Sequence, residues 1–321
     1  NICYFPEINL DNYTLINENK IVTKNYSCQY YENSKTIYSN FKVFQNNSMI
    51  KNESSPKSEV YNYFKENVLN NEEYQYLDIM KDLIDNGDKR QTRNAITYSK
   101  FGVRMEFDLN DNKIPILTTK RVACKTVIKE LLWFIKGSTD NKELQDQNVH
   151  IWDGNSSREY LDKNGFFDRE ENELGPIYGF QWRHFNAEYE DCDSDYSNKG
   201  IDQLNDIINL LKNPETRNSR RLIMTAWNPC QIHEMALPPC HILCQFNVTG
   251  GNKLSCALYQ RSGDVGLGVP FNIASYSLLT HLIAHHTGLD AHEFIYYLGN
   301  AHIYDDHIEY LKIQQEREPY N

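Results

Sequence analysis

The chain has 321 residues, a length that allows one large domain or two ordinary ones. Hydrophobic residues make up 40% of the chain and aromatic residues 12%, which is enough for a packed core and excludes disorder of the whole. The formal net charge of −11 disfavours nucleic acid or an acidic membrane surface as the partner, so any anion site must be local. No apolar run approaches the roughly 18 residues of a membrane span.

The eight cysteines are scattered along the chain and include no C-x2-C pair. This usage predicts neither a zinc site nor a disulfide framework, and it fits reduced thiols in a cytoplasmic protein that holds no metal. The chain begins with Asn1 rather than Met and shows no signal peptide, so we interpret it as a piece of a longer protein.

The first part of the chain reads as a linker, a helix and a strand. Residues 45–71 are rich in Asn, Ser, Lys and Glu, which predicts a linker with one weak helix over 60–69. Helical spacing of apolar residues then predicts an amphipathic helix that closes at Asn86-Gly87. Its apolar residues are Tyr76, Ile79, Met80, Leu83 and Ile84. A polar loop over 88–97 precedes a predicted strand, whose apolar face is Phe101, Val103, Met105 and Phe107.

Two helices and a strand are predicted in the middle of the chain. The apolar stripe of the first helix is Ile128, Leu131, Leu132 and Ile135. Glu130 lies beside this stripe, where a carboxyl could have a raised pKa and relay protons, although an exposed glutamate is the plainer interpretation. The stripe of the second helix is Leu204, Ile207, Ile208 and Leu211. Between them, residues 183–200 are acidic and predict a surface loop. After them, Arg220-Arg221 open a predicted strand that runs to Trp227, and adjacent arginines on a strand point opposite ways.

Residues 235–246 read Met-Ala-Leu-Pro-Pro-Cys-His-Ile-Leu-Cys-Gln-Phe, which predicts a stiff, extended approach to a strand. Cys240 and His241 would point to opposite faces, which argues against a dyad of these two neighbours. If Cys240 is a nucleophile, a nearby arginine is the usual means of stabilising its thiolate. The alternative is a buried, inert cysteine.

Further polar residues follow Cys240. Gly266-Leu267-Gly268 lacks the Gly-Lys-Ser/Thr of a P-loop, but as a turn it lets the backbone approach a ligand closely. Asn272 heads a predicted helix, and it either caps that helix or offers its amide to one edge of a pyrimidine. His302 and Tyr304 share strand parity and would project together, which suits hydrogen bonds to a ribose hydroxyl.

Four segments in this order resemble the thymidylate synthase family: 174–183, 235–246, 259–276 and 299–304. The likeness covers about residues 73–318. It implies an α+β fold over 73–321, a large mixed sheet flanked by helices that dimerises through its sheet face, with the C-terminal end of the domain missing. It also implies a methyltransferase reaction, the reductive methylation of dUMP to dTMP by 5,10-methylenetetrahydrofolate, with dihydrofolate as product.

The resemblance assigns roles to individual residues. The catalytic residues would be Cys240, Glu130, Tyr178 and Asn272. The residues that bind dUMP would be Arg93, Arg220, Arg221, His241, Gln260, Arg261, Ser262, Asp264, Asn272, His302 and Tyr304. The residues that bind folate would be Trp152, Asp264, Leu267, Gly268 and Phe271. The Arg220-Arg221 pair would come from the partner subunit of a homodimer, and Arg93 would hold phosphate, with Arg90 as the alternative.

Residues 1–47 resemble the closing strands of dihydrofolate reductase, through Phe5-Pro6-Glu7-Ile8, Tyr13-Thr14-Leu15 and the strand-like 37–44. With 48–72 as a linker, the chain is expected to be part of a bifunctional reductase–synthase, and NADPH would serve only the reductase. An unrelated hairpin is the alternative for this short region.

Two other functions stay open. A pyrimidine hydroxymethylase would use the same scaffold on dCMP, although the amide of Asn272 favours uracil. A catalytically silent synthase-like binding protein is the non-enzyme alternative. The polar residues retained together argue against it: Cys240, Arg261, Asp264, Asn272, His302 and Tyr304.

Overall fold

The computed structural model describes residues 14–17, 20–22, 26–32, 38–45, 48–56, 71–92 and 95–320. The chain divides into two compact units, Asn1–Tyr74 with Glu316–Asn321, and Gln75–Gln315. Among the described residues, no helix is both long and apolar enough to cross a membrane.

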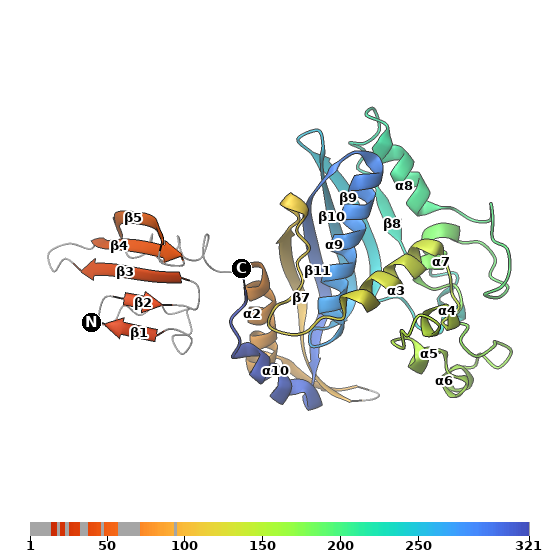
Figure 1. Ribbon diagram of the computed structural model, residues 1–321. Helices are drawn as coiled ribbons and strands as arrows, with labels where there is room; N and C mark the ends of the chain where they lie inside the picture. Colours follow the sequence, from red (N-terminus) through yellow and green to blue (C-terminus); the bar gives the residue numbers. More distant parts are fainter. Residues whose placement is uncertain are drawn as a thin grey trace. The chain divides into compact units, whose positions relative to one another are not determined.

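The first unit contains an antiparallel sheet whose strands follow one another in chain order (Figure 1). Its strands are β1 (Thr14–Asn17), β2 (Lys20–Val22), β3 (Tyr26–Glu32), β4 (Tyr38–Gln45) and β5 (Ser48–Pro56). β5 occupies the start of the segment expected to be a linker and pairs with β4. The weak helix predicted over 60–69 lies outside the described residues, and the domain boundaries at 47 and 72 stay predictions.

The second unit is built on a six-stranded mixed sheet in the order β6-β7-β11-β10-β9-β8. Its strands are β6 (Asp88–Gln91), β7 (Ile96–Asp108), β8 (Ile223–Thr225), β9 (His241–Thr249), β10 (Lys253–Asp264) and β11 (Asp290–Tyr304). β10 and β11 run parallel, and the other neighbours are antiparallel. The predicted α+β class with a mixed sheet is confirmed.

The helices of the described residues are α2 (Asn71–Asn86), α3 (Cys124–Lys136), α4 (Lys142–Gln145), α5 (Asp153–Ser156), α6 (Arg158–Lys163), α7 (Tyr178–His184), α8 (Gln203–Lys212), α9 (Gly268–Thr287) and α10 (Ile308–Gln315). α9 is the crossover that joins the parallel strands β10 and β11, and it packs on both of them (Figure 1). It is apolar on most sides because α3 covers it in turn, and α3 also packs on α7. The sheet, α9 and α3 therefore form successive packed layers, and the candidate site described below lies on them.

The core of this unit is filled by alternate residues of β9, β10 and β11, and the side chains of these residues face α9. These buried residues are Cys244, Phe246, Cys256, Leu258, Phe294, Tyr296 and Leu298. On the opposite sheet face, Tyr259 and Tyr297 stay 38% and 40% exposed, so that face is not fully covered within this chain.

Several predicted elements are confirmed and others are wrong in detail. α2 and α8 carry the expected apolar stripes. The stripe predicted for α3 is wrong at Ile128 and Leu132, which are exposed, because the helix instead turns Val127, Leu131 and Phe134 inward. Residues 88–97 are not all loop, since β6 pairs there with β7. Phe101 is 83% exposed rather than part of a buried face.

Candidate active site

Cys240 directly precedes β9 and is held by a guanidinium. Arg261, on the neighbouring strand β10, donates from Nε to the carbonyl of Pro239 at 2.8 Å and from Nη2 to that of Pro238 at 2.9 Å. Its own backbone N–H donates to the carbonyl of Cys240 at 2.9 Å. The two prolines stiffen the chain and Arg261 fixes their direction, so the thiol is presented at a defined place at the start of β9.

Tyr178 also holds the backbone of Cys240. Its hydroxyl oxygen accepts the backbone N–H of Cys240 at 2.7 Å. The Tyr178 ring is buried at the start of α7 and contacts Phe134, Trp152 and His241, with centroids 4.9–5.9 Å away. The residue that the sequence assigned to proton removal thus lies against the backbone of the candidate nucleophile.

Two opposing effects act on the thiol of Cys240. Burial raises the pKa of this thiol, while the charge of Arg261 and the hydrogen bond with Tyr178 lower it, and burial is the larger effect. The expectation that an arginine favours the thiolate is correct in direction. Arg261 does not by itself bring the pKa below its ordinary value.

Asn272 belongs to a buried polar network between α9 and the sheet. It is the fifth residue of α9, so it is not the helix cap that the sequence allowed. Its Nδ2 is 2.8 Å from Nε2 of His241, and burial lowers the pKa of His241 to about 3, so this imidazole is neutral. On its other side Asn272 faces Tyr296, which also contacts Gln260.

Glu130 on α3 accepts a hydrogen bond from the indole Nε1 of Trp152 at 2.8 Å. Desolvation raises the pKa of Glu130 to about 7, and the indole hydrogen bond offsets only part of this. The prediction of a raised pKa at this position is confirmed in direction. The rings of Trp133, Phe134 and Tyr178 surround Trp152 at 5.9–6.4 Å and form an aromatic wall.

Asp264 ends β10 directly opposite His302 of β11. Its Oδ1 accepts the backbone N–H groups of Gly266 and Leu267 at 2.8 and 3.2 Å, which holds the turn before α9. Burial raises the pKa of Asp264 and lowers that of His302. The rings of His302 and Tyr304 meet edge to face at 5.4 Å, so these two side chains lie together as their parity predicted.

The sequence did not single out Lys120 or Tyr296. Lys120 donates from Nζ to the carbonyl of Gly266. Burial lowers the pKa of its ammonium, and the negative charge of Asp264 raises that pKa by a smaller amount. Tyr296 shares strand parity with His302 and Tyr304, and that parity was the available signal. The folate-assigned residues lie at this turn and in the first part of α9: Leu267, Gly268 and Phe271.

Of the other arginines assigned to phosphate, the structure describes Arg220 and Arg221, and it does not place this pair at Cys240. Arg93 lies outside the described residues. Arg220 and Arg221 are exposed and form a turn before β8, which corrects the expectation that they lie on a strand reaching Trp227. Ile223 pairs with Gln245, which is five residues after Cys240. Because β8 and β9 are antiparallel, Arg220 and Arg221 lie still farther from Cys240 along the sheet. At about 3.3 Å per residue this separation is roughly 16 Å or more.

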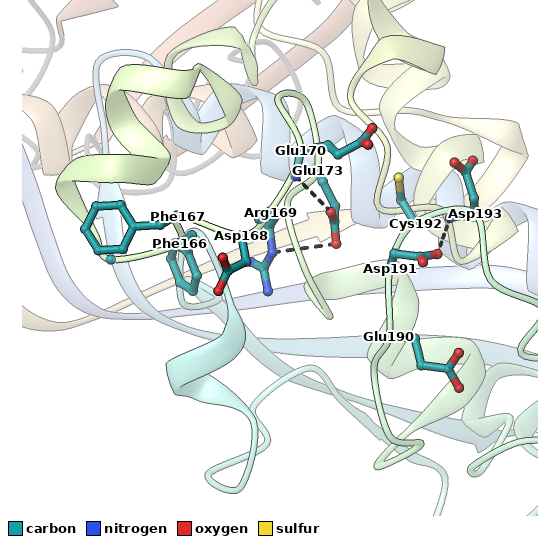
Figure 2. Close-up of a pocket in the computed structure, with 11 residues that line it drawn as sticks. Phe166, Phe167, Asp168, Arg169, Glu170, Glu173, Glu190, Asp191, Cys192 and Asp193 are labelled. Carbon is teal, nitrogen blue, oxygen red and sulfur yellow. Dashed lines mark hydrogen bonds and ion pairs between the residues drawn. The ribbon is translucent and has the colours of Figure 1, made fainter.

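A separate pocket of about 500 Å³ contains none of the predicted site residues (Figure 2). Its lining is mostly acidic, with Arg169 directed toward Glu173 at 3.6 Å. The acidic lining residues are Asp168, Glu170, Glu173, Glu190, Asp191 and Asp193. This charge would repel a nucleotide phosphate, so the pocket does not compete with the Cys240 site.

The fold and the site define an α+β domain that presents a fixed thiol beside a guanidinium, a buried amide and an aromatic wall. Residues 74–321 match the thymidylate synthase family, and the chain belongs to that family.

Similar proteins include the human thymidylate synthase, 57% identical over 249 residues, which are 77% of this chain and 78% of the human protein. The bifunctional dihydrofolate reductase-thymidylate synthase of Plasmodium berghei is 53% identical over 286 residues, 88% of this chain and 48% of that protein. A probable thymidylate synthase of Schizosaccharomyces pombe is 54% identical over 259 residues, 78% of this chain and 41% of that protein. The chain thus spans about half the length, or less, of these last two relatives.

Proposed function

We propose that this chain is the synthase part of a bifunctional dihydrofolate reductase–thymidylate synthase, and that it methylates dUMP to dTMP. The observation that carries the proposal is the placement of Cys240, which Arg261 and Tyr178 fix from two sides. Family membership over 74–321 supports the same reaction.

In this reaction Cys240 Sγ adds to C6 of uracil, which makes C5 nucleophilic. C5 then takes a one-carbon unit and loses its proton, while the bond from that carbon to the donor nitrogen breaks. The bond between Sγ and C6 also breaks, and the one-carbon unit on C5 receives a hydride to become the methyl group of dTMP. Glu130, with a pKa of about 7, can exchange protons near neutral pH, and Tyr178 lies close enough to Cys240 to assist. The amide of Asn272 would hydrogen-bond the uracil edge and stabilise the enolate.

The residues present fit a bound folate. The aromatic wall around Trp152 suits a flat pterin, and Asp264 at the turn before α9 offers a carboxyl for its polar edge. Leu267, 55% exposed, would add apolar contact beside Gly268 and Phe271. Bound 5,10-methylenetetrahydrofolate supplies both the carbon and the hydride, and it would leave as dihydrofolate. The synthase therefore needs no nicotinamide.

We further infer a homodimer with shared sites. Arg261 can reach a nucleotide phosphate within its own chain, together with Ser262 and with Arg93 or Arg90. The exposed pair Arg220-Arg221 lies too far along β9 to do so, and an isologous interface would bring the pair to the partner's site. The incompletely covered sheet face with Tyr259 and Tyr297 supports dimerisation through that face.

The bifunctional assignment is supported by the extent of one similarity. The Plasmodium berghei protein matches 88% of this chain, more than residues 74–321 can supply, so part of the region before the synthase domain also matches. NADPH would serve only a reductase domain.

The test is product analysis with the full chain, dUMP and 5,10-methylenetetrahydrofolate. We expect dTMP and dihydrofolate to form in equal amounts. A hydroxymethylase would instead give a hydroxymethylated nucleotide without dihydrofolate, and it would favour dCMP. Either that pattern, or the absence of any product, would contradict the proposal.

A further inference from the structure

Tyr296 lies at the centre of the buried network that holds Asn272. Its side chain is fully buried on β11, and its hydroxyl donates to Oε1 of Gln260. The same hydroxyl lies 3.3 Å from Oδ1 of Asn272. His241 holds the other end of this amide, with Nε2 at 2.8 Å from Nδ2. Both ends of the Asn272 amide are thus in contact with protein groups.

A freely rotating asparagine cannot distinguish uracil from cytosine. At the edge formed by N3 and position 4, uracil presents an N–H donor and an O4 acceptor, whereas cytosine presents an N3 acceptor and an amino donor. A half-turn of the amide exchanges its donor and its acceptor, so the same side chain could pair with either base. Preference for uracil therefore requires neighbours that fix the amide in one orientation.

We propose that Tyr296 is a positioning residue that fixes the orientation of the Asn272 amide and so sets the preference for dUMP over dCMP. This inference rests on the proposed function of the Cys240 site. Tyr296 is fully buried and would act through Asn272 rather than by touching the nucleotide.

The orientation is anchored to the backbone. The backbone carbonyl of Ser262 can only accept a hydrogen bond, and Nε2 of Gln260 donates to it at 2.8 Å. This bond fixes the Gln260 amide so that its Oε1 faces Tyr296. The single hydroxyl hydrogen of Tyr296 faces two acceptors, Oε1 of Gln260 and, at 3.3 Å, Oδ1 of Asn272, and is shared between them as a three-centre hydrogen bond. Neutral His241 completes the arrangement by facing Nδ2. Because Gln260 and Asn272 are buried, water does not readily replace a lost contact.

The test compares the dissociation constants of dUMP and dCMP, measured by calorimetry on the full chain and on Tyr296→Phe. Phenylalanine keeps the ring and removes only the hydroxyl. We expect the preference for dUMP to fall about tenfold, the scale of one lost buried hydrogen bond, while both nucleotides still bind. Tyr189→Phe is the matched control, because it removes a partly buried hydroxyl that bonds Thr139 at 2.9 Å outside this network. This control should keep the wild-type ratio.

A double-mutant cycle separates positioning from general loosening. The carboxylate in Asn272→Asp has two like oxygens and no orientation to fix, so adding Tyr296→Phe to it should leave the ratio unchanged. Tyr296→Met also removes the hydroxyl, should lower the preference as well, and replaces Tyr296→Phe if that variant does not fold.

An unchanged ratio in Tyr296→Phe, or an equal loss of affinity for both nucleotides, would overturn this inference. A wild-type chain that binds neither nucleotide would instead contradict the proposed function.

Discussion

Individual residues of the site are tuned by burial more than by charge. The thiol of Cys240 and the carboxyls of Glu130 and Asp264 all have raised pKa values, and burial is the main cause for each. Each group is therefore kept closer to its protonated form than it would be in water. For Glu130 a pKa of about 7 suits proton exchange near neutral pH, whereas for Cys240 the raised pKa opposes formation of the thiolate.

Glu130 gives a prediction about stability and pH. Its pKa rises from an ordinary value of 4.5 to about 7 in the folded protein. Between these values the folded protein binds more protons than the unfolded chain, so this carboxyl makes the free energy of unfolding fall as pH rises through the window. Urea unfolding on both sides of the window should show that Glu130→Gln removes this fall. Glu309→Gln, at a side chain that is 81% exposed, is the control and should follow the wild type.

Asn272 gives a prediction about substrate choice. Asn272→Asp should weaken dUMP relative to dCMP, because an ionised carboxylate only accepts hydrogen bonds and cannot serve both N3–H and O4 of uracil. The measurement is the ratio of kcat/KM for the two nucleotides before and after the change. An unchanged ratio would show that Asn272 only holds His241.

Among the elements, the contact of α3 with α7 places Tyr178. Gly179 lies in this contact, and a Cβ there would overlap the carbonyl and Cα of Phe134. The two helices can approach closely only because residue 179 has no side chain. The position of Tyr178, and through it of Cys240, therefore depends on a glycine.

Gly179→Ala should lower the free energy of unfolding by about 1–3 kcal/mol, the usual cost of overpacking, and should lower activity with it. Gly154→Ala is the control, because its Cβ would meet nothing within 4 Å inside α5. Denaturant unfolding checks both variants. Equal stability of the two would show that α3 and α7 can separate without cost.

Much of the element structure could be predicted from local pattern, and the errors have physical causes. Helical spacing correctly predicted α2 and α8. In α3 it wrongly placed Ile128 and Leu132 on the buried face, although both are exposed. Periodicity shows that a helix is amphipathic, but it cannot show which of two apolar stripes meets α9. β6 is polar along its length, so only its pairing with β7 reveals it. The paired contacts of Cys240 with Tyr178 and of Asn272 with His241 join distant segments, and no local pattern encodes them.

At the scale of the whole molecule, the proposed function would require the acidic chain to gather several arginines around the phosphate of dUMP. Arg261 is available at Cys240, but the pair Arg220-Arg221 is exposed at the far part of β9. A twofold dimer would solve this problem, because each subunit would present its pair to the other.

Mixing two inactive variants tests whether the site is shared. Cys240→Ser subunits mixed with Arg221→Ala subunits should regain activity, since some heterodimers would contain one site that lacks both defects. Arg221→Ala alone should lose about 1.5–3 kcal/mol of transition-state binding, the scale of a charge-assisted contact. Cys240→Ser mixed with Arg261→Ala is the control, and it should not recover because both residues serve the same chain's site. If subunits exchange and the first mixture stays inactive, Arg221 does not act across the interface.

The most direct test of the account is tritium release from dUMP labelled at C5, measured with the full chain and 5,10-methylenetetrahydrofolate. The wild type should release tritium only when the folate is present. Cys240→Ser should release almost none while still binding dUMP, because a serine hydroxyl does not ionise near neutral pH. Cys244→Ala, at a buried cysteine on β9, should keep the activity at some cost in stability. Release by Cys240→Ser that approaches the release by Cys244→Ala would contradict the account.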